Sequence, residues 1–204
     1  MLTNLRLAQI YAVLRLEVRK TLLARRGIWV YLLAFSPVLL YGGHTILMIR
    51  NGRPCDFGVD TRIFATVFQV FYLRLAIFFG CLGIFMNLIR GEVLDKSMHF
   101  YFLAPVRREV VLAGKFLAGL CVAIATYCSS IVVQFFALYA QFDWQTVQEY
   151  LSPNQGLQHL GAYVGVTLLA CIGYGSVFLA AGILLRNPLV PAAVMLVWEA
   201  ANPF

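Results

Sequence analysis

Charged side chains are scarce in this 204-residue sequence. Only 12% of the residues are Asp, Glu, Lys or Arg, whereas a soluble globular domain carries about 25%. Hydrophobic residues make up 61% of the chain. A surface so poor in charge cannot face water throughout, so the composition excludes an ordinary soluble domain and predicts a surface in contact with lipid.

Several catalytic motifs are also missing. An ATP-binding loop needs Gly-x-x-x-x-Gly-Lys-Ser/Thr, because backbone amides hold the phosphates and the hydroxyl reaches Mg²⁺. The nearest string, at 112–116, lacks the first glycine and the hydroxyl. The three histidines are scattered, and no Cys-x-x-Cys or Gly-x-Ser-x-Gly occurs. We therefore expect no catalytic site, no metal ion and no cofactor on this chain, and interpret its cysteines as small packing residues.

Long apolar runs are present instead. In lipid every backbone N–H and C=O must be bonded within the protein, and the runs lack the alternation of barrel strands, so they predict helices. A hydrocarbon core about 30 Å thick takes about 20 residues of helix. The predicted spans are 28–49, 67–89, 111–140, 160–185 and a shorter fifth at 188–204. We expect an all-α integral membrane protein, a single transmembrane domain over 1–204 with about five transmembrane helices.

Lys and Arg are unevenly distributed among the connections. Twelve lie in 1–26, in the connection after the second span, at the start of the third span or at Arg186, and three lie between the first two spans. Basic loops stay in the cytoplasm, so the pattern predicts a cytoplasmic N-terminus in the cytoplasmic (inner) membrane. The asymmetry explains the net charge of +7. It favours anionic lipid head groups over nucleic acid as the partner.

The first 26 residues predict an amphipathic helix. One stripe of this helix is apolar and contains Leu7, Ile10, Tyr11, Leu14, Val18 and Leu22. The remaining arc contains Arg6, Arg15, Glu17, Arg19 and Lys20. Such a helix either lies in the membrane interface or packs on a soluble partner, and we favour the interface because it leads directly into the first span. We expect no cleavable signal peptide, since that span is too long for one.

The connection at 90–110 has features beyond those of a simple turn. Glu92, Asp95 and Lys96 have helical spacing, an aromatic segment follows, and Pro105 interrupts it. The charges could serve only to set the topology, or the segment could bind a partner. Its density of aromatic residues favours a partner.

At this connection the sequence resembles the inner-membrane permease subunit of type-2 ATP-binding-cassette (ABC) exporters. These proteins have an amphipathic elbow helix before the first span, here Leu5 to Arg25. After the second span they have a glutamate and then a pattern close to L-x-x-P-x-x-R-x-x-x-x-x-x-K. The corresponding residues are Arg90-Gly91-Glu92, Leu103-Ala104-Pro105-Val106-Arg107-Arg108 and Gly114-Lys115, with Leu103 one position closer to Pro105 than the pattern has it.

The resemblance implies a transport subunit and not an enzyme. Two ABC ATPase subunits would bind ATP and Mg²⁺, and a second permease subunit would complete a homodimer or heterodimer. The coupling segment would contact the ATPases through Glu92, Asp95, Lys96, Pro105, Arg107 and Arg108. The family usually has six spans, so we expect either that this chain is truncated or that the sixth span and the outer re-entrant segment are absent.

Polar residues inside the spans are the candidates for a substrate path. Arg74 is the outstanding one, because a charge at bilayer depth costs roughly 2.5 to 3.5 kcal/mol. It could line a path for an anionic substrate, pair with a carboxylate of a partner, or extend to the interface if the second span begins near Tyr72. The third span adds Tyr127, Ser129 and Gln134. Such residues often connect helices instead.

Three functions are compatible with these features. The first is export of an unidentified substrate, driven by a separate ATPase. The second is a structural or assembly subunit of a larger membrane complex, with the basic helix and the aromatic connection as docking surfaces. The third is a lipid-modifying enzyme, for which the sequence shows no convergent set of His, Asp or Glu residues.

Overall fold

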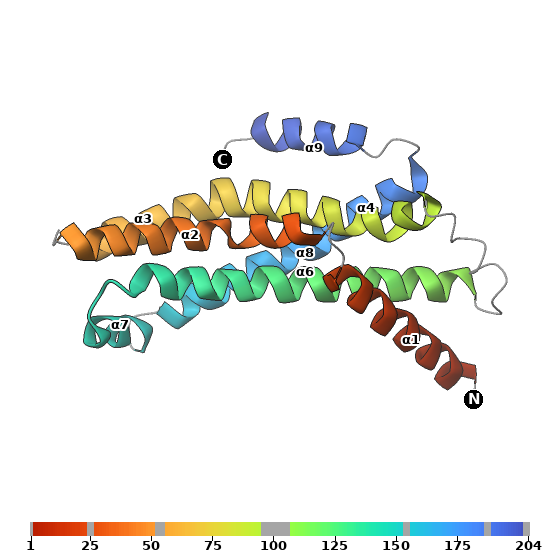
Figure 1. The fold of residues 1–204 in the computed structure, drawn as a ribbon, viewed down its shortest axis with the longest axis horizontal. Helices are drawn as coiled ribbons and strands as arrows, with labels where there is room; N and C mark the ends of the chain where they lie inside the picture. The colour runs from red at the N-terminus through yellow and green to blue at the C-terminus, as the bar shows by residue number, and fades with distance from the viewer. Residues whose placement is uncertain are drawn as a thin grey trace. The chain divides into compact units, whose positions relative to one another are not determined.

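A computed structural model describes residues 2–23, 27–51, 56–94, 107–152, 156–185 and 189–201. These ranges are helical and contain no β-strand (Figure 1). In chain order the helices are α1 (Leu2–Leu23), α2 (Ile28–Asn51), α3 (Phe57–Val67), the π-helix η2 (Phe68–Ile77), α4 (Phe78–Leu94), α6 (Arg108–Tyr139), α7 (Trp144–Leu151), α8 (Gly156–Leu184) and α9 (Leu189–Ala201). The all-α prediction is confirmed.

Four helical stretches are long and apolar enough to cross a membrane. They are Ile28–Asn51, Phe57–Met86, Arg108–Tyr139 and Gly156–Leu184. They correspond to the first four predicted spans, and the chain is a multi-pass integral membrane protein. Helix α9 lies where the fifth span was predicted. It has 13 residues, fewer than the about 20 that a hydrocarbon core requires.

The second span differs most from its predicted bounds. It begins at Phe57, earlier than the apolar run indicated, and α3, η2 and α4 continue without interruption to Leu94. The Asp56 carboxylate accepts hydrogen bonds from the backbone N–H groups of Gly58 and Val59, at 2.8 and 3.2 Å. Such a cap stabilises a helix N-terminus. A count of apolar residues misses this start, because the first turns of the helix contain charged residues.

Two shorter helices flank the spans. Helix α1 covers most of the first 26 residues, as predicted. Helix α7 lies in the connection between the third and fourth spans, where the sequence predicted no helix. It begins after Asp143, whose carboxylate accepts a hydrogen bond from the backbone N–H of Gln145 at 3.3 Å.

The chain divides into two compact units, to which the long helices contribute different parts. The first unit comprises Met1–Val30, Phe79–Ala123 and Cys171–Phe204, and the second comprises Tyr31–Phe78 and Ile124–Ala170. Each unit has a core of its own.

The core of the first unit includes Phe85 of α4, whose side chain is fully buried. A Cβ atom on Gly119 of α6 would lie 2.7 Å from Phe85 Cε1, and one on Gly175 of α8 would lie 2.6 Å from Cζ. Such distances leave no room for any side chain larger than hydrogen. The two glycines therefore allow α6 and α8 to approach the phenyl ring, as small residues do between membrane helices.

Gly175→Ala is expected to destabilise the protein, because the added methyl group must displace the buried Phe85 ring. Overpacking of this kind costs about 1–3 kcal/mol. Gly165→Ala on the same helix is the matched control, because a Cβ there would have no atom within 4 Å. Unfolding of the purified variants by sodium dodecyl sulfate (SDS) in mixed micelles measures the difference. Equal midpoints for the two variants would show that the ring moves aside without cost.

Aromatic side chains fill the core of the second unit. The ring of Phe64 packs against Tyr41, Phe135 and Tyr163, with centroid distances of 5.3, 5.9 and 5.1 Å. Phe135 also packs against Tyr139 at 4.7 Å. Tilted and edge-to-face arrangements of this kind are favourable for aromatic pairs. These contacts join α2, α3, α6 and α8 within the unit.

Candidate functional site

A buried ion pair in the first unit connects Lys115 of α6 to Glu17 of α1. Lys115 Nζ lies 2.7 Å from Glu17 Oε1, and the two side chains are 6% and 2% exposed, respectively. Lys115 Nζ also donates a hydrogen bond to the backbone oxygen of Leu88 in α4, at 3.2 Å. One ammonium group therefore connects α1, α4 and α6.

This pair corrects two sequence-based predictions. A lone lysine near the end of an apolar run is expected to extend back to the interface, and the polar arc predicted for the first helix contains Glu17. Instead both side chains are buried and bonded to each other. Either charge alone would be costly to bury, and the partner compensates it. The two residues are 98 positions apart, so no local spacing indicates their contact.

Helix α1 approaches α6 at Gly114, the residue before Lys115. A Cβ atom on Gly114 would lie 2.8 Å from Val13 Cγ1 and 3.4 Å from the backbone oxygen of Ile10. A side chain at this position would push α1 away from α6, and Glu17 with it. Gly114 and Lys115 together form the docking point of α1.

The apolar stripe predicted for α1 faces the protein only in part. Ile10 and Leu14 are half-buried, whereas Tyr11 is 65% and Leu22 is 43% exposed. The side of α1 that docks on α6 contains Glu17. The helix is therefore rotated relative to the predicted orientation, because the ion pair and the Gly114 contact set its angle.

The residues assigned to coupling lie at or beyond the helix ends. Glu92 lies in the last turn of α4. Arg107 directly precedes α6, Arg108 is its first residue, and both side chains are exposed. These positions lie in or next to the two helices that Lys115 connects, and the coupling role stays a prediction. Three further residues lie outside the described part of the chain: Asp95, Lys96 and Pro105.

Arg74 lies on the π-helix η2, well inside the second span. The helix that contains Arg74 begins at Phe57 and not near Tyr72, and whether Arg74 extends to the interface stays a prediction. The Arg74 side chain is half-buried and has an interaction partner within the protein. π-Helical segments are rare and occur frequently at functional sites. Arg74 is therefore the foremost candidate for a functional charge inside a span.

Tyr127 is buried and exchanges hydrogen bonds with η2. Its hydroxyl donates to the backbone oxygen of Ala76 at 2.9 Å, and the Tyr72 hydroxyl donates to the backbone oxygen of Tyr127 at 2.7 Å. A π-helix departs from the α-helical bonding pattern, and the phenol supplies a donor to one of its carbonyl groups. The two tyrosines therefore hold α6 against η2 close to Arg74.

The other polar residues of the third span have different environments. The buried Gln134 amide donates to Ser130 Oγ at 2.9 Å, and Ser130 donates to the backbone oxygen of Ala34 in α2 at 2.6 Å. Ser129 is exposed and donates to a carbonyl of its own helix at 3.0 Å. Tyr127 and Ser130 thus connect helices, as polar groups in membrane spans often do, whereas Gln134 bonds within α6 and supports Ser130. A substrate path that includes them stays a prediction.

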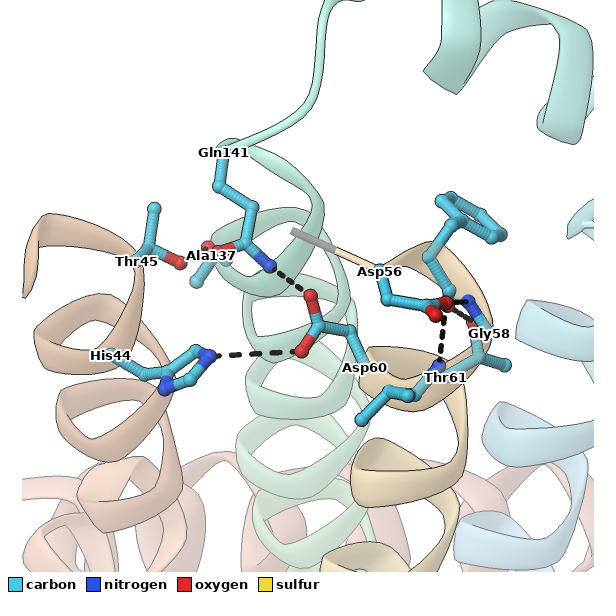
Figure 2. A network of polar contacts seen from close by, with 10 residues as sticks. His44, Thr45, Asp56, Gly58, Asp60, Thr61, Ala137 and Gln141 are labelled. Carbon is cyan, nitrogen blue, oxygen red and sulfur yellow. Dashed lines mark hydrogen bonds and ion pairs between the residues drawn. The ribbon is translucent and has the colours of Figure 1, made fainter. Parts of the chain in front are cut away.

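A second polar cluster surrounds Asp60 of α3 in the second unit (Figure 2). Asp60 Oδ2 accepts a hydrogen bond from Gln141 Nε2 at 2.6 Å, and Oδ1 lies 3.6 Å from His44 Nε2. Nearby, the Thr45 hydroxyl donates to the backbone oxygen of Ala137 at 3.0 Å. The predicted spans 28–49 and 67–89 leave Asp60 in the connection between them, so this cluster was not predicted. An aspartate shortly before an apolar run is the sequence signal that could have indicated this cluster.

The cysteines and histidines form no ligand set in the described residues, where no three His, Cys, Asp or Glu side chains could hold a metal ion together. Cys81 and Cys171 are fully buried, as the packing interpretation predicts. Cys121 is exposed, so that interpretation fails there. The His159 ring shares a hydrogen bond with the Tyr150 hydroxyl at 2.9 Å.

Comparison with known proteins gives no match. The chain matches no protein-family profile, no curated protein and no solved structure. The resemblance to type-2 ABC permeases therefore depends on the residues at 90–115 and on the order of the spans.

Proposed function

We propose that the chain is the permease subunit of a type-2 ABC exporter. It exports an unidentified substrate across the cytoplasmic membrane, with its N-terminus in the cytoplasm. Two separate nucleotide-binding subunits hydrolyse ATP with Mg²⁺, and a second permease subunit completes the transporter. The observation that carries this proposal is the buried ion pair between Lys115 and Glu17.

The ion pair makes a mechanical connection at the 90–110 segment. Helices α4 and α6 flank this segment, and Lys115 bonds to the backbone of α4 from a position near the start of α6. Through Glu17 it also holds α1. A movement of the segment is then passed to three helices together. A buried pair adds little net stability, because desolvation offsets the attraction, and in this proposal it serves to fix how the helices move.

Two exposed arginines provide the contact with the ATPase. Arg107 and Arg108 lie at the junction of the 90–110 segment and α6. Their side chains can reach acidic groups of a partner, and complementary charges give an interface its specificity. If the chain is instead an assembly subunit, these arginines would contact a protein without ATPase activity. The identity of the partner separates the two functions.

Co-purification tests the proposal. The chain isolated from its native membranes in a mild detergent should bring with it an ATPase that contains the Gly-x-x-x-x-Gly-Lys-Ser/Thr loop. Mass spectrometry identifies the subunit, and the complex should hydrolyse ATP. An unrelated multi-pass membrane protein purified in parallel is the control. Repeated preparations that contain only partners without this loop would reject the exporter and support an assembly subunit.

A further inference from the structure

We propose that Arg15 and Arg19 of α1 form a binding site for the phosphate group of an anionic membrane phospholipid. The two residues lie four positions apart, and both side chains are exposed. Within the described residues the ion pairs involve other side chains, and neither arginine takes part in one. The inference does not depend on the proposed transport function, because it concerns only α1 and the bilayer.

The two guanidinium groups are placed to bind an anion from outside the chain. Like charges at positions i and i+4 of a helix repel each other. The carboxylate that lies between them in the sequence, Glu17, is buried on the docking side of α1 and bonded to Lys115. It therefore cannot compensate Arg15 and Arg19 on the exposed side. Arginine binds phosphate oxygens through two parallel hydrogen bonds, which makes phosphate the best-fitting anion.

The surroundings of the two arginines favour a lipid over an acidic protein. Tyr11, Leu16 and Leu22 are 65%, 59% and 43% exposed on α1. Helices that present basic and apolar side chains together bind the interface of anionic bilayers. Trp29, at the start of α2, is 73% exposed, and tryptophan is typical of the head-group level. A phospholipid offers a phosphate and apolar groups in one molecule.

A bound lipid would hold α1 from the side opposite to its docking point. Glu17 and Val13 attach the helix to Lys115 and Gly114, and the lipid phosphate would attach it to the membrane through Arg15 and Arg19. The position of α1 against α6 would then depend on the lipid composition of that leaflet.

Native mass spectrometry of the detergent-purified protein tests the site. The protein is titrated with dioleoyl phosphatidylglycerol, with zwitterionic dioleoyl phosphatidylcholine as the comparison lipid and inorganic phosphate in a separate arm. The double variant Arg15→Gln/Arg19→Gln keeps two good helix formers on the exposed face. The matched control, Arg50→Gln/Arg62→Gln, removes two exposed arginines from α2 and α3.

The double variant should bind phosphatidylglycerol about 25-fold more weakly, since each basic residue near an anionic surface contributes about fivefold. Its binding of phosphatidylcholine, whose choline cation neutralises the phosphate, should fall less than its binding of phosphatidylglycerol. Its thermal stability should match that of the unchanged protein, and the control should bind phosphatidylglycerol as tightly as the unchanged protein. Unchanged phosphatidylglycerol binding by the double variant would overturn the proposal and direct the search to an acidic protein partner. Equally tight binding of inorganic phosphate would overturn it too, by showing a site for the free ion.

Discussion

Lys115→Met is expected to destabilise the protein by about 3–5 kcal/mol, because it removes the ammonium group that compensates the buried Glu17 carboxylate. The Glu17 side chain is 2% exposed and accepts its hydrogen bond from Lys115. Water cannot reach the carboxylate without a movement of α1 away from α6. Glu17→Met should be similarly costly, since it removes the carboxylate that compensates the buried ammonium group of Lys115.

The double variant Lys115→Met/Glu17→Met should recover most of the lost stability. Replacing a buried pair by apolar residues of similar volume is often neutral or stabilising. Unfolding by SDS in mixed micelles gives the four stabilities of a double-mutant cycle, and the coupling energy follows from them. Arg62→Met, which removes an exposed charge, is the control. Additive losses in the double variant would show that the two side chains do not depend on each other.

Arg107→Glu is expected to abolish most of the stimulation of the partner ATPase while leaving membrane insertion intact. Arg107 is exposed directly before α6, and reversing its charge places like charges against an acidic partner surface. Coupling between sites is typically worth a factor of roughly 5 to 150, and we expect a loss in this range. The measurement is the ATPase rate of the nucleotide-binding subunit, reconstituted in liposomes with each variant. Glu92→Lys, at the other end of the segment, should act in the same direction.

Arg62→Glu is the matched control for this experiment, since it makes the same charge reversal at an exposed position of α3, outside the 90–110 segment. Normal stimulation by Arg107→Glu and by Glu92→Lys would reject the coupling role. The Lys115→Met/Glu17→Met variant adds a third readout. If this variant folds stably but stimulates the ATPase poorly, the ion pair transmits movement between the helices. Full stimulation of the ATPase would show that the ion pair is only a structural contact.

The spans could be predicted because they depend on local composition. Leu160 to Leu185 contains no charged residue, and a helix spans Gly156–Leu184. The second span was predicted too short because its first turns contain charged residues, which the Asp56 cap and the packing of Asp60 accommodate. The short helix α7 was missed because its eight residues give too brief a pattern.

The functional residues were predictable only in part. The coupling positions came from a short pattern and from the family resemblance, and they stay untested. Arg74 stood out because a charge inside a span is costly. His44, Asp60 and Gln141 did not stand out, because each lies near a helix end, where polar residues are common. Their contact becomes visible only when α2, α3 and the end of α6 are packed together.

By itself the sequence determined that this chain is helical, enters lipid and crosses it several times, because apolar length and missing charge act locally on each segment. The tertiary structure alone decided how α1 is oriented. Burial forced Lys115 and Glu17 to compensate each other across a separation that no periodicity encodes, and that contact turned Arg15 and Arg19 outward.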